Sequence, residues 1–145
     1  MGLDELIMRE ECATFVYHLA RHLDNQEFEA VQKCFTSDAM ILVNDQLAYP
    51  VSELTLERLQ KDSFGYKPRL ITSVTVTPLG PDEAKVFCYC TIMRDAFPST
   101  EWRFDLVKTV DGWRCKRRHA LIVECFPGEL AQAFEAQRRT NTAKN

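Results

Sequence analysis

The residue best suited to proton transfer in this sequence is His119, which follows a strong turn signal. Residues 101–125 contain two runs rich in aromatic and branched side chains that meet at Asp111-Gly112, a dipeptide typical of a β-hairpin with a two-residue loop. Such a loop predicts the cross-strand pairs Val110 with Trp113, Lys108 with Cys115, Leu106 with Arg117, Phe104 with His119 and Trp102 with Leu121. Because side chains alternate between the faces of a strand, His119 is predicted to share an apolar face with Trp102 and Phe104.

An imidazole among apolar side chains has two interpretations. Desolvation disfavours its charged form and a nearby carboxylate favours it, so the group could exchange protons near neutral pH. It could equally be a core histidine with a satisfied hydrogen bond. Arg117, predicted on the same face, could bind a substrate oxygen or form an ion pair at the rim, as could Arg94. A bulge or a longer loop would shift the register and point Arg118 inward instead.

The neighbouring strand, residues 84–94, carries small side chains on its predicted inward face: Ala84, Val86, Cys88, Cys90 and Ile92. Small residues opposite aromatic ones leave space that a ligand could fill, which makes Cys90 a candidate ligand contact. A tightly curved sheet, however, also needs small residues on its concave side. Segment 63–68 adds Phe64 and Tyr66, which form either a lid over a ligand or a cover for the core edge.

These candidate residues require a sheet backed by helices. Apolar residues in 3–23 recur with helical spacing, and Asp24 and Glu27 match a capping box that would start a short second helix. A strand at 39–43, a turn at 44–46, a third helix from Ser52, strands at 69–77 and 84–94, the hairpin and a helix at 129–138 are then expected. The predicted class is α+β, with helices on one face of a curved sheet.

Length and charge limit the possible functions. The chain has 145 residues, which suits one domain and is short for two; we expect a single domain over 1–138 and a flexible tail over 139–145. The net charge is −3 and the basic residues are dispersed, which argues against nucleic-acid binding. No stretch approaches the roughly 20 apolar residues that span a bilayer, and no secretory leader is evident, so we expect a cytoplasmic protein without a membrane partner.

Metal-ligating residue types are present but unsuitably spaced. The six cysteines include no C-x-x-C pair and fall at apolar positions, so we interpret them as buried thiols. His18 and His22 stand four residues apart without the glutamate of the metalloprotease pattern. We therefore expect neither a metal nor another cofactor.

The stretches ARHLDNQEFEAVQKCFTSDAMILV and FDLVKTVDGWRCKRR resemble the nuclear transport factor two-like superfamily, over about residues 5–125. The resemblance is closest to SnoaL-like polyketide cyclases and dehydratases and to the β subunits of aromatic-ring-hydroxylating dioxygenases, whose ending is similar to residues 112–134. It implies a cone-shaped, curved antiparallel or mixed sheet with the N-terminal helices packed on its concave face, the cystatin-like fold.

The resemblance also implies a role for Asp24. This residue falls where SnoaL-like and scytalone-dehydratase-like enzymes have a pocket aspartate, although a helix cap would explain it as well. The histidine that those groups often carry falls at Leu70, and the asparagine that follows it falls at Ser73. His119 could replace the missing histidine.

Ketosteroid isomerase chemistry is disfavoured. Its tyrosine and its base would fall at Leu19 and near Val43, neither of which can donate to an oxyanion or accept a proton.

Two functions remain open. The first is a small-molecule pocket protein, a SnoaL-like dehydratase, cyclase or isomerase that acts by proton transfer on a hydrophobic, oxygenated ring compound in the cone. The second is a non-catalytic subunit that, like a dioxygenase β subunit, binds an iron-containing α subunit. Either is expected to form a homodimer or a higher homo-oligomer. The candidate site comprises Asp24 and His119 as acid and base, with Phe64, Tyr66, Cys90, Trp102, Phe104 and Arg117 as substrate contacts.

Overall fold

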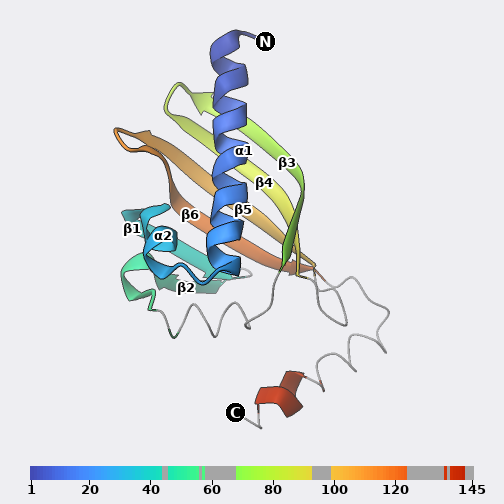
Figure 1. The fold of residues 1–145 in the computed structure, drawn as a ribbon. Coiled ribbons are helices and arrows are strands. Elements are labelled where there is room, and N and C mark those ends of the chain that lie inside the picture. Colours follow the sequence, from blue (N-terminus) through green and yellow to red (C-terminus); the bar gives the residue numbers. More distant parts are fainter. Residues whose placement is uncertain are drawn as a thin grey trace.

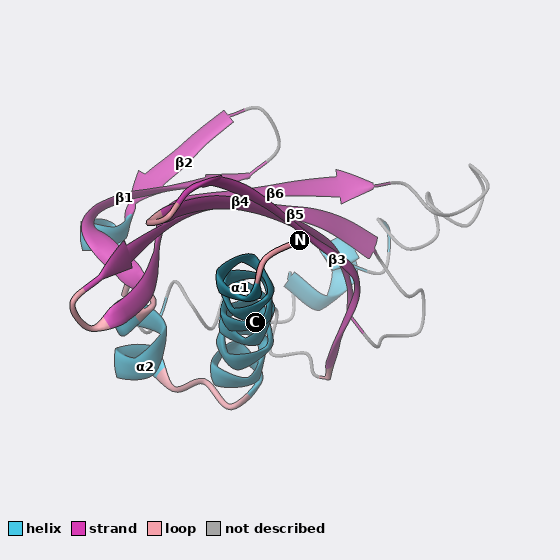
Figure 2. Ribbon diagram, turned by 90° about the horizontal axis from the view of Figure 1, so that it is seen from above, coloured by secondary structure: helices cyan, strands magenta, loops and turns pink. Residues whose placement is uncertain are grey.

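In the computed structural model, one long helix lies in the hollow of a curved sheet of six strands (Figures 1 and 2). The structure describes residues 1–43, 46–55, 57, 68–92, 99–123, 136 and 138–142. Its elements are α1 (Leu3–Asp24), α2 (Phe28–Lys33), β1 (Phe35–Val43), β2 (Gln46–Pro50), the 3-10 helix η1 (Val51–Glu53), β3 (Arg69–Gly80), β4 (Glu83–Ile92), β5 (Ser99–Thr109) and β6 (Gly112–Val123). The predicted α+β class, with a helix on the concave face, is confirmed.

The strands lie in the order β2-β1-β6-β5-β4-β3. β1 runs parallel to β6, and the other neighbouring strands are antiparallel. Figure 2 shows the sheet arching over α1, with α2 beside β1. The sheet is therefore mixed, and its concave face and α1 enclose the core.

The length of α1 follows from its apolar spacing. Cys12, Val16, Leu19 and Leu23 recur every three or four residues and are all buried, which gives the helix one face toward the sheet. Asp4 and Glu5 lie in the first turn, where the helix dipole favours acids. The long amphipathic helix that the sequence predicts is thus observed, one residue longer at its end.

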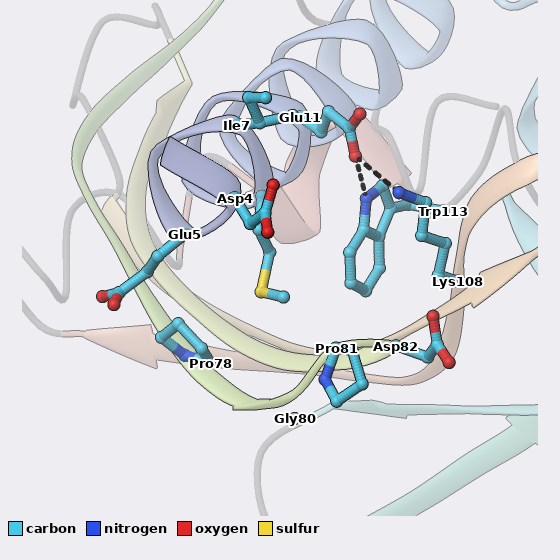
Figure 3. Close-up of a pocket in the computed structure, with 11 residues that line it drawn as sticks. Asp4, Glu5, Ile7, Glu11, Pro78, Gly80, Pro81, Asp82, Lys108 and Trp113 are labelled. Atoms are coloured by element: carbon cyan, nitrogen blue, oxygen red, sulfur yellow. Dashed lines mark hydrogen bonds and ion pairs between the residues drawn. The ribbon is translucent and has the colours of Figure 1, made fainter. Parts of the chain in front are cut away.

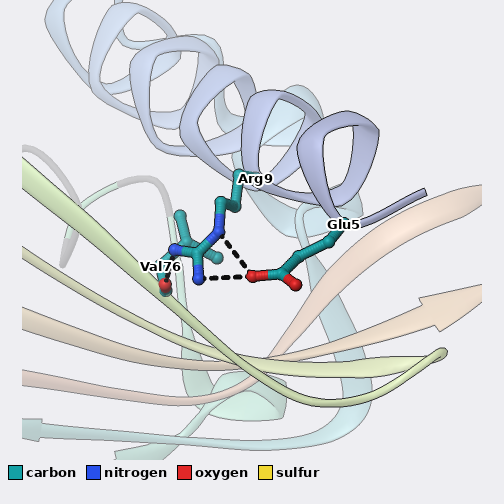
Figure 4. Close-up of polar contacts among 3 residues, drawn as sticks. All are labelled: Glu5, Arg9 and Val76. Carbon is teal, nitrogen blue, oxygen red and sulfur yellow. Dashed lines mark hydrogen bonds and ion pairs between the residues drawn. The ribbon is translucent and has the colours of Figure 1, made fainter. Parts of the chain in front are cut away.

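Polar contacts join the first half of α1 to β3. Arg9 donates a hydrogen bond to the carbonyl oxygen of Val76 at 2.5 Å and forms an ion pair with Glu5 at 2.7 Å (Figure 4). Glu5 and Arg9 are one helical turn apart, a spacing that brings their side chains together. This contact fixes the beginning of α1 over the middle of β3.

β3 contains a bulge that its sequence does not predict, because alternation over residues 69–77 places Leu70, Thr72, Val74 and Val76 on one face. The pairing of β3 with β4 shifts between Thr72 and Thr75, and Ser73 has a φ of 56°. The expected face of Leu70, Thr72, Val74 and Val76 is therefore broken, because a bulge moves the following side chains to the other face. Ile71 packs on the core instead, whereas Leu70 is 45% exposed.

The predicted register of the hairpin is wrong. Its loop residues are Val110 and Asp111, and Thr109 pairs with Gly112. Gly112 has a φ of 106°, and neither Val110 nor Asp111 has a positive φ, whereas the turn assumed from the dipeptide needs positive φ at both of its central residues. Asp-Gly therefore occupies the last two positions of the turn.

A second shift follows within the hairpin. Leu106 pairs with Cys115 and Asp105 pairs with Arg117, so Lys116 is an extra residue in β6. Beyond this bulge Phe104 faces Arg118 and Trp102 faces Ala120. Arg118, not His119, therefore lies on the concave face.

Smaller predictions also need correction. The expected turn at 44–46 is followed by a strand, β2, that begins at Gln46. Around Ser52 the described residues form a short 3-10 helix that ends before Leu54, which has extended backbone, while Leu56 and Leu59 of the expected helix lie outside the described residues. The capping box does not form, since Asp24 ends α1 and the N-cap of α2, Glu27, makes no side-chain cap bond.

Several expected features lie outside the described residues, namely Phe64, Tyr66, Arg94 and most of the helix expected at 129–138. Residue 138 is helical as expected, and residues 139–142, which were expected to belong to the tail, are helical as well. Among the helices that the structure describes, none combines the length and apolarity that crossing a bilayer requires.

Candidate functional site

A single row of paired residues crosses the concave face and contains one charge. In order across the sheet, the paired residues are Tyr49, Ile41, Arg118, Phe104, Val86 and Val76. Every member except Arg118 is an apolar or aromatic residue that is less than 9% exposed. Arg118 is therefore a cation set into an apolar wall.

Arg118 is held by an aromatic ring. Its guanidinium carbon lies 4.6 Å from the centre of the Trp102 ring, a cation–π contact. Its Nε is enclosed and has no hydrogen-bond partner. Burial lowers the pKa of the guanidinium, and Arg69 lowers it further, but the ordinary value is so high that the group keeps its charge at neutral pH.

Trp102 belongs to an aromatic chain that reaches α1. It meets Phe104 edge to face at 5.8 Å between ring centres, and Phe104 meets Phe15 of α1 at 6.3 Å. Three of the predicted substrate contacts, Trp102, Phe104 and Cys90, lie together on this buried wall. Ligand contact by these residues remains a prediction.

Asp24 lies at the end of α1 and is bound by Arg69. Oδ1 is 2.5 Å from Nη1 of Arg69, and Oδ2 accepts the backbone N–H of the same residue at 3.1 Å. The side chains are 17% and 4% exposed, respectively. The bulge in β3 puts Arg69 on the concave side, so this pair ties the end of α1 to the beginning of β3.

The Asp24–Arg69 pair also borders a pocket of about 360 Å³ between α1 and β3. Its lining residues are Tyr17, Ala20, Arg21, Asp24, Arg69, Leu70, Ile71 and Thr72. The carboxylate of Asp24 is therefore accessible to a small molecule from this side.

Cys90 connects the two arginines electrostatically. Burial raises the pKa of its thiol to about 11, while Arg69 and Arg118 act to lower it and Asp24 to raise it. All of these groups therefore lie near one another, at one end of the concave face. The pKa of Cys88 is raised to about 12 by burial, so both thiols stay protonated and unreactive at neutral pH.

The predicted pairing of Asp24 with His119 does not occur. His119 pairs with Arg103 in β5 and with Leu42 in β1, on the side of the sheet away from α1, because its neighbour Arg118 faces the core. Arg117 pairs with Asp105 and is exposed on the same convex side. The bulge at Lys116 is the reason in both cases.

Sequence reasoning missed Arg69 and Tyr49 as members of this region, and assigned Arg118 only as an alternative. The run Arg117-Arg118-His119 does not show which of its side chains faces the core, because the alternation of side chains assigns a face only when the register of the strand is known. Ser73 carried no recognisable bulge signal such as glycine.

A second polar cluster lies toward the other end of α1 and borders a pocket of about 500 Å³ (Figure 3). The indole N–H of Trp113 donates to Oε2 of Glu11 at 2.7 Å, and Lys108 lies 3.4 Å from the same oxygen. The bond from Trp113, and then the charge of Lys108, lower the pKa of Glu11. This cluster is already internally paired.

Metal ligation finds no support in the described part of the chain, where no group of three or more suitable side chains gathers. The rings of His18 and His22 are 6.4 Å apart, and His22 lies 3.6 Å from a carboxylate oxygen of Glu27.

Solved structures of similar shape have low sequence identity. A protein of unknown function with a cystatin-like fold from Nostoc punctiforme has a TM-score of 0.69 at 18% identity, covering 88% of this chain and 96% of that chain. A protein from Novosphingobium aromaticivorans with a proposed scytalone dehydratase activity has a TM-score of 0.69 at 14% identity, covering 85% and 89%. Another from the same organism, a proposed aromatic ring hydroxylase, has a TM-score of 0.64 at 17% identity, covering 82% and 90%.

These likenesses establish the cystatin-like fold that the resemblance implied. No curated protein matches the chain in sequence. The sequence pattern of the SnoaL-like domain, however, matches residues 4–119, which include α1, the bulged strands and the concave-face residues. The chain therefore belongs to the SnoaL-like domain family.

Proposed function

We propose that this protein binds a small, hydrophobic, oxygenated ring compound against the concave face and transforms it by proton transfer, as a dehydratase, cyclase or isomerase without a cofactor. The observation that carries the proposal is Asp24, a carboxylate beside an apolar wall that also borders an open pocket. The SnoaL-like family and the proposed dehydratase activity of one solved relative support the class of reaction.

Asp24 is the proposed proton acceptor. Each of its oxygens accepts one bond from Arg69, which fixes the carboxylate plane and leaves a lone pair on each oxygen for a substrate proton. Arg69 acts as a positioning residue. A ring compound that entered the pocket beside Asp24, which Leu70 and Ile71 also line, would present a C–H or O–H group to the carboxylate.

Proton exchange tests this assignment without knowledge of the natural substrate. The protein is incubated with 2-tetralone in deuterium oxide, and deuterium incorporation beside the carbonyl is followed by NMR. We expect exchange faster than in buffer, and Asp24→Asn should remove about a hundredfold or more of the acceleration, as the loss of a general base does.

His119→Ala is the matched control. Because His119 lies on the convex face, we expect its replacement to leave the exchange rate unchanged. The assignment would be wrong if the Asp24→Asn protein, shown to be folded by its melting curve, exchanged as fast as the wild type.

The alternative is a non-catalytic partner of an oxygenase α subunit, which we propose would bind at the convex face. There Tyr89 is 39% exposed and packs edge to face on Phe87, with 5.1 Å between ring centres. Purification from the native host distinguishes the two functions. A stable complex with the absorbance of an iron–sulfur subunit would favour the alternative, and a homo-oligomer free of such a subunit would exclude it.

A further inference from the structure

Arg118 has no counter-charge among the residues that the structure describes, and we propose that the ligand supplies one: the concave-face site takes a ring compound that bears a carboxylate, and the carboxylate pairs with Arg118. This inference rests on the proposed function in one respect, the placement of a ring compound on the concave face. It adds the chemical class of that compound.

The other arginines show how unusual Arg118 is. Arg9, Arg69, Arg103 and Arg114 each form an ion pair with a carboxylate. Arg21 and Arg117 are exposed, so water can solvate them. Arg118 is half-buried, and no carboxylate lies within ion-pair distance of it among the residues that the structure describes. Since enclosing an unpaired charge is costly, this arrangement favours an anion from outside.

The two terminal nitrogens of Arg118 can receive that anion. They make no hydrogen bond among the described residues, and, unlike Nε, neither of them is fully enclosed. The ring of Trp102 lies against the guanidinium, with its centre 4.6 Å from the guanidinium carbon. Two N–H groups in a fixed plane match the two oxygens of a carboxylate, the geometry for which arginine is better suited than lysine.

The surroundings of Arg118 define the rest of the ligand. Ile41 and Phe104 flank it in the paired row, and Trp102 lies over it. These side chains are at most 3% exposed and give the guanidinium an apolar surrounding, while Arg69 is the charged side chain that acts on it. A carboxylate attached to an aromatic or alicyclic ring satisfies both parts of the site.

A pair of nearly isosteric probes tests the inference. Binding of 2-naphthoate and of 2-naphthamide is measured by calorimetry at pH 7 for the wild type, Arg118→Met and Arg117→Met. In the wild type we expect the carboxylate to bind about tenfold more tightly than the amide, the advantage of one charge-assisted contact. Arg118→Met should lose this preference while its affinity for the amide stays within about threefold.

Arg117→Met is the control, because Arg117 is the adjacent arginine on the convex face; it should retain the wild-type preference. Arg118→Lys keeps the charge without the planar pair of donors and should keep only part of the preference. The change in the melting temperature of the wild type on adding each probe measures binding without the use of any variant.

The outcomes separate the two proposals. If the wild type binds both probes equally, or if folded Arg118→Met keeps the preference, the carboxylate inference is overturned while ring binding stands. If neither probe binds or shifts the melting temperature, the binding of ring compounds at this face is overturned, and the inference fails with it.

Discussion

Arg69 and Arg118 both lie on the concave face in strands that contain a β-bulge, but the groups that surround them there differ. Each lies beyond one extra residue in its strand, at Ser73–Val74 in β3 and at Lys116 in β6. Arg69 contacts the carboxylate of Asp24 at 2.5 Å, whereas Arg118 lies against the ring of Trp102 and has no carboxylate within ion-pair distance in the described part of the chain. One bulge thus leads to an internal ion pair and the other to an unpaired cation.

The difference shows which arginine serves the fold and which is available to a ligand. Turning an arginine inward removes it from water, and this cost is offset for Arg69 by Asp24. For Arg118 the described residues supply a cation–π contact in place of a counter-charge, and such a contact is weaker than a paired charge. Stability measurements on the two arginines should therefore give effects of opposite sign.

The largest expected effect is that of Arg69→Met. It leaves Asp24 without its guanidinium partner, and loss of one member of a buried pair costs about 3 to 5 kcal/mol. Since Asp24 is 17% exposed and could still accept a backbone N–H, we expect a loss near the lower limit. Urea unfolding measures it. The double variant Asp24→Asn with Arg69→Met should recover part of the stability that the single variant loses. A cost of Arg69→Met below about 1 kcal/mol would contradict the structural role of the pair.

The next effect has the opposite direction. Arg118→Met replaces an unpaired, half-buried cation by an apolar side chain of similar length. Replacing even a buried ion pair by apolar residues is often neutral or stabilising by about 1 to 4 kcal/mol. Loss of the contact with Trp102 reduces the gain, so we expect about 1 kcal/mol in the absence of ligand. Melting curves measure it, with Arg117→Met expected within about 0.5 kcal/mol of the wild type. A clear loss of stability on Arg118→Met would mean that the protein itself satisfies this charge.

The two bulges also mark where sequence reasoning reached its limit. The stripe of Cys12, Val16 and Leu19 predicted α1 because helical burial repeats along the chain without reference to any partner. The hairpin was likewise predicted from its strands and its Asp-Gly turn. Neither signal needs long-range information.

Predicting which side chains of β6 face the core does require long-range information. Whether Arg117, Arg118 or His119 faces the core depends on one extra residue in β6, Lys116, and an extra residue is recognised only once the partner strands and their register are known. The inward placement of Arg69 depends in the same way on Ser73. The wall of Cys90, Trp102 and Phe104 was predictable, but the charges set into it were not.

The smallest expected effect concerns a pair that is exposed, and it tests whether burial is what separates the two arginines. Glu11 and Lys108 are 40% and 43% exposed, so their interaction is screened by water and Glu11→Gln should cost less than about 1 kcal/mol. The glutamine oxygen can still accept the N–H of Trp113, so the change removes mainly the charge.

The pH dependence of this small effect identifies its origin. The folded protein lowers the pKa of Glu11 from its ordinary value of 4.5, chiefly through Trp113 and then Lys108. A lowered carboxyl pKa contributes stability above the unfolded value, and that stability is lost as pH falls through the folded value. The difference between wild type and Glu11→Gln should therefore be present at pH 7 and close as the pH falls below 4.5. If this difference in stability stayed constant down to pH 3, packing and not charge would be its cause. The contrast between the paired and the unpaired charges of this protein would then not be electrostatic in origin.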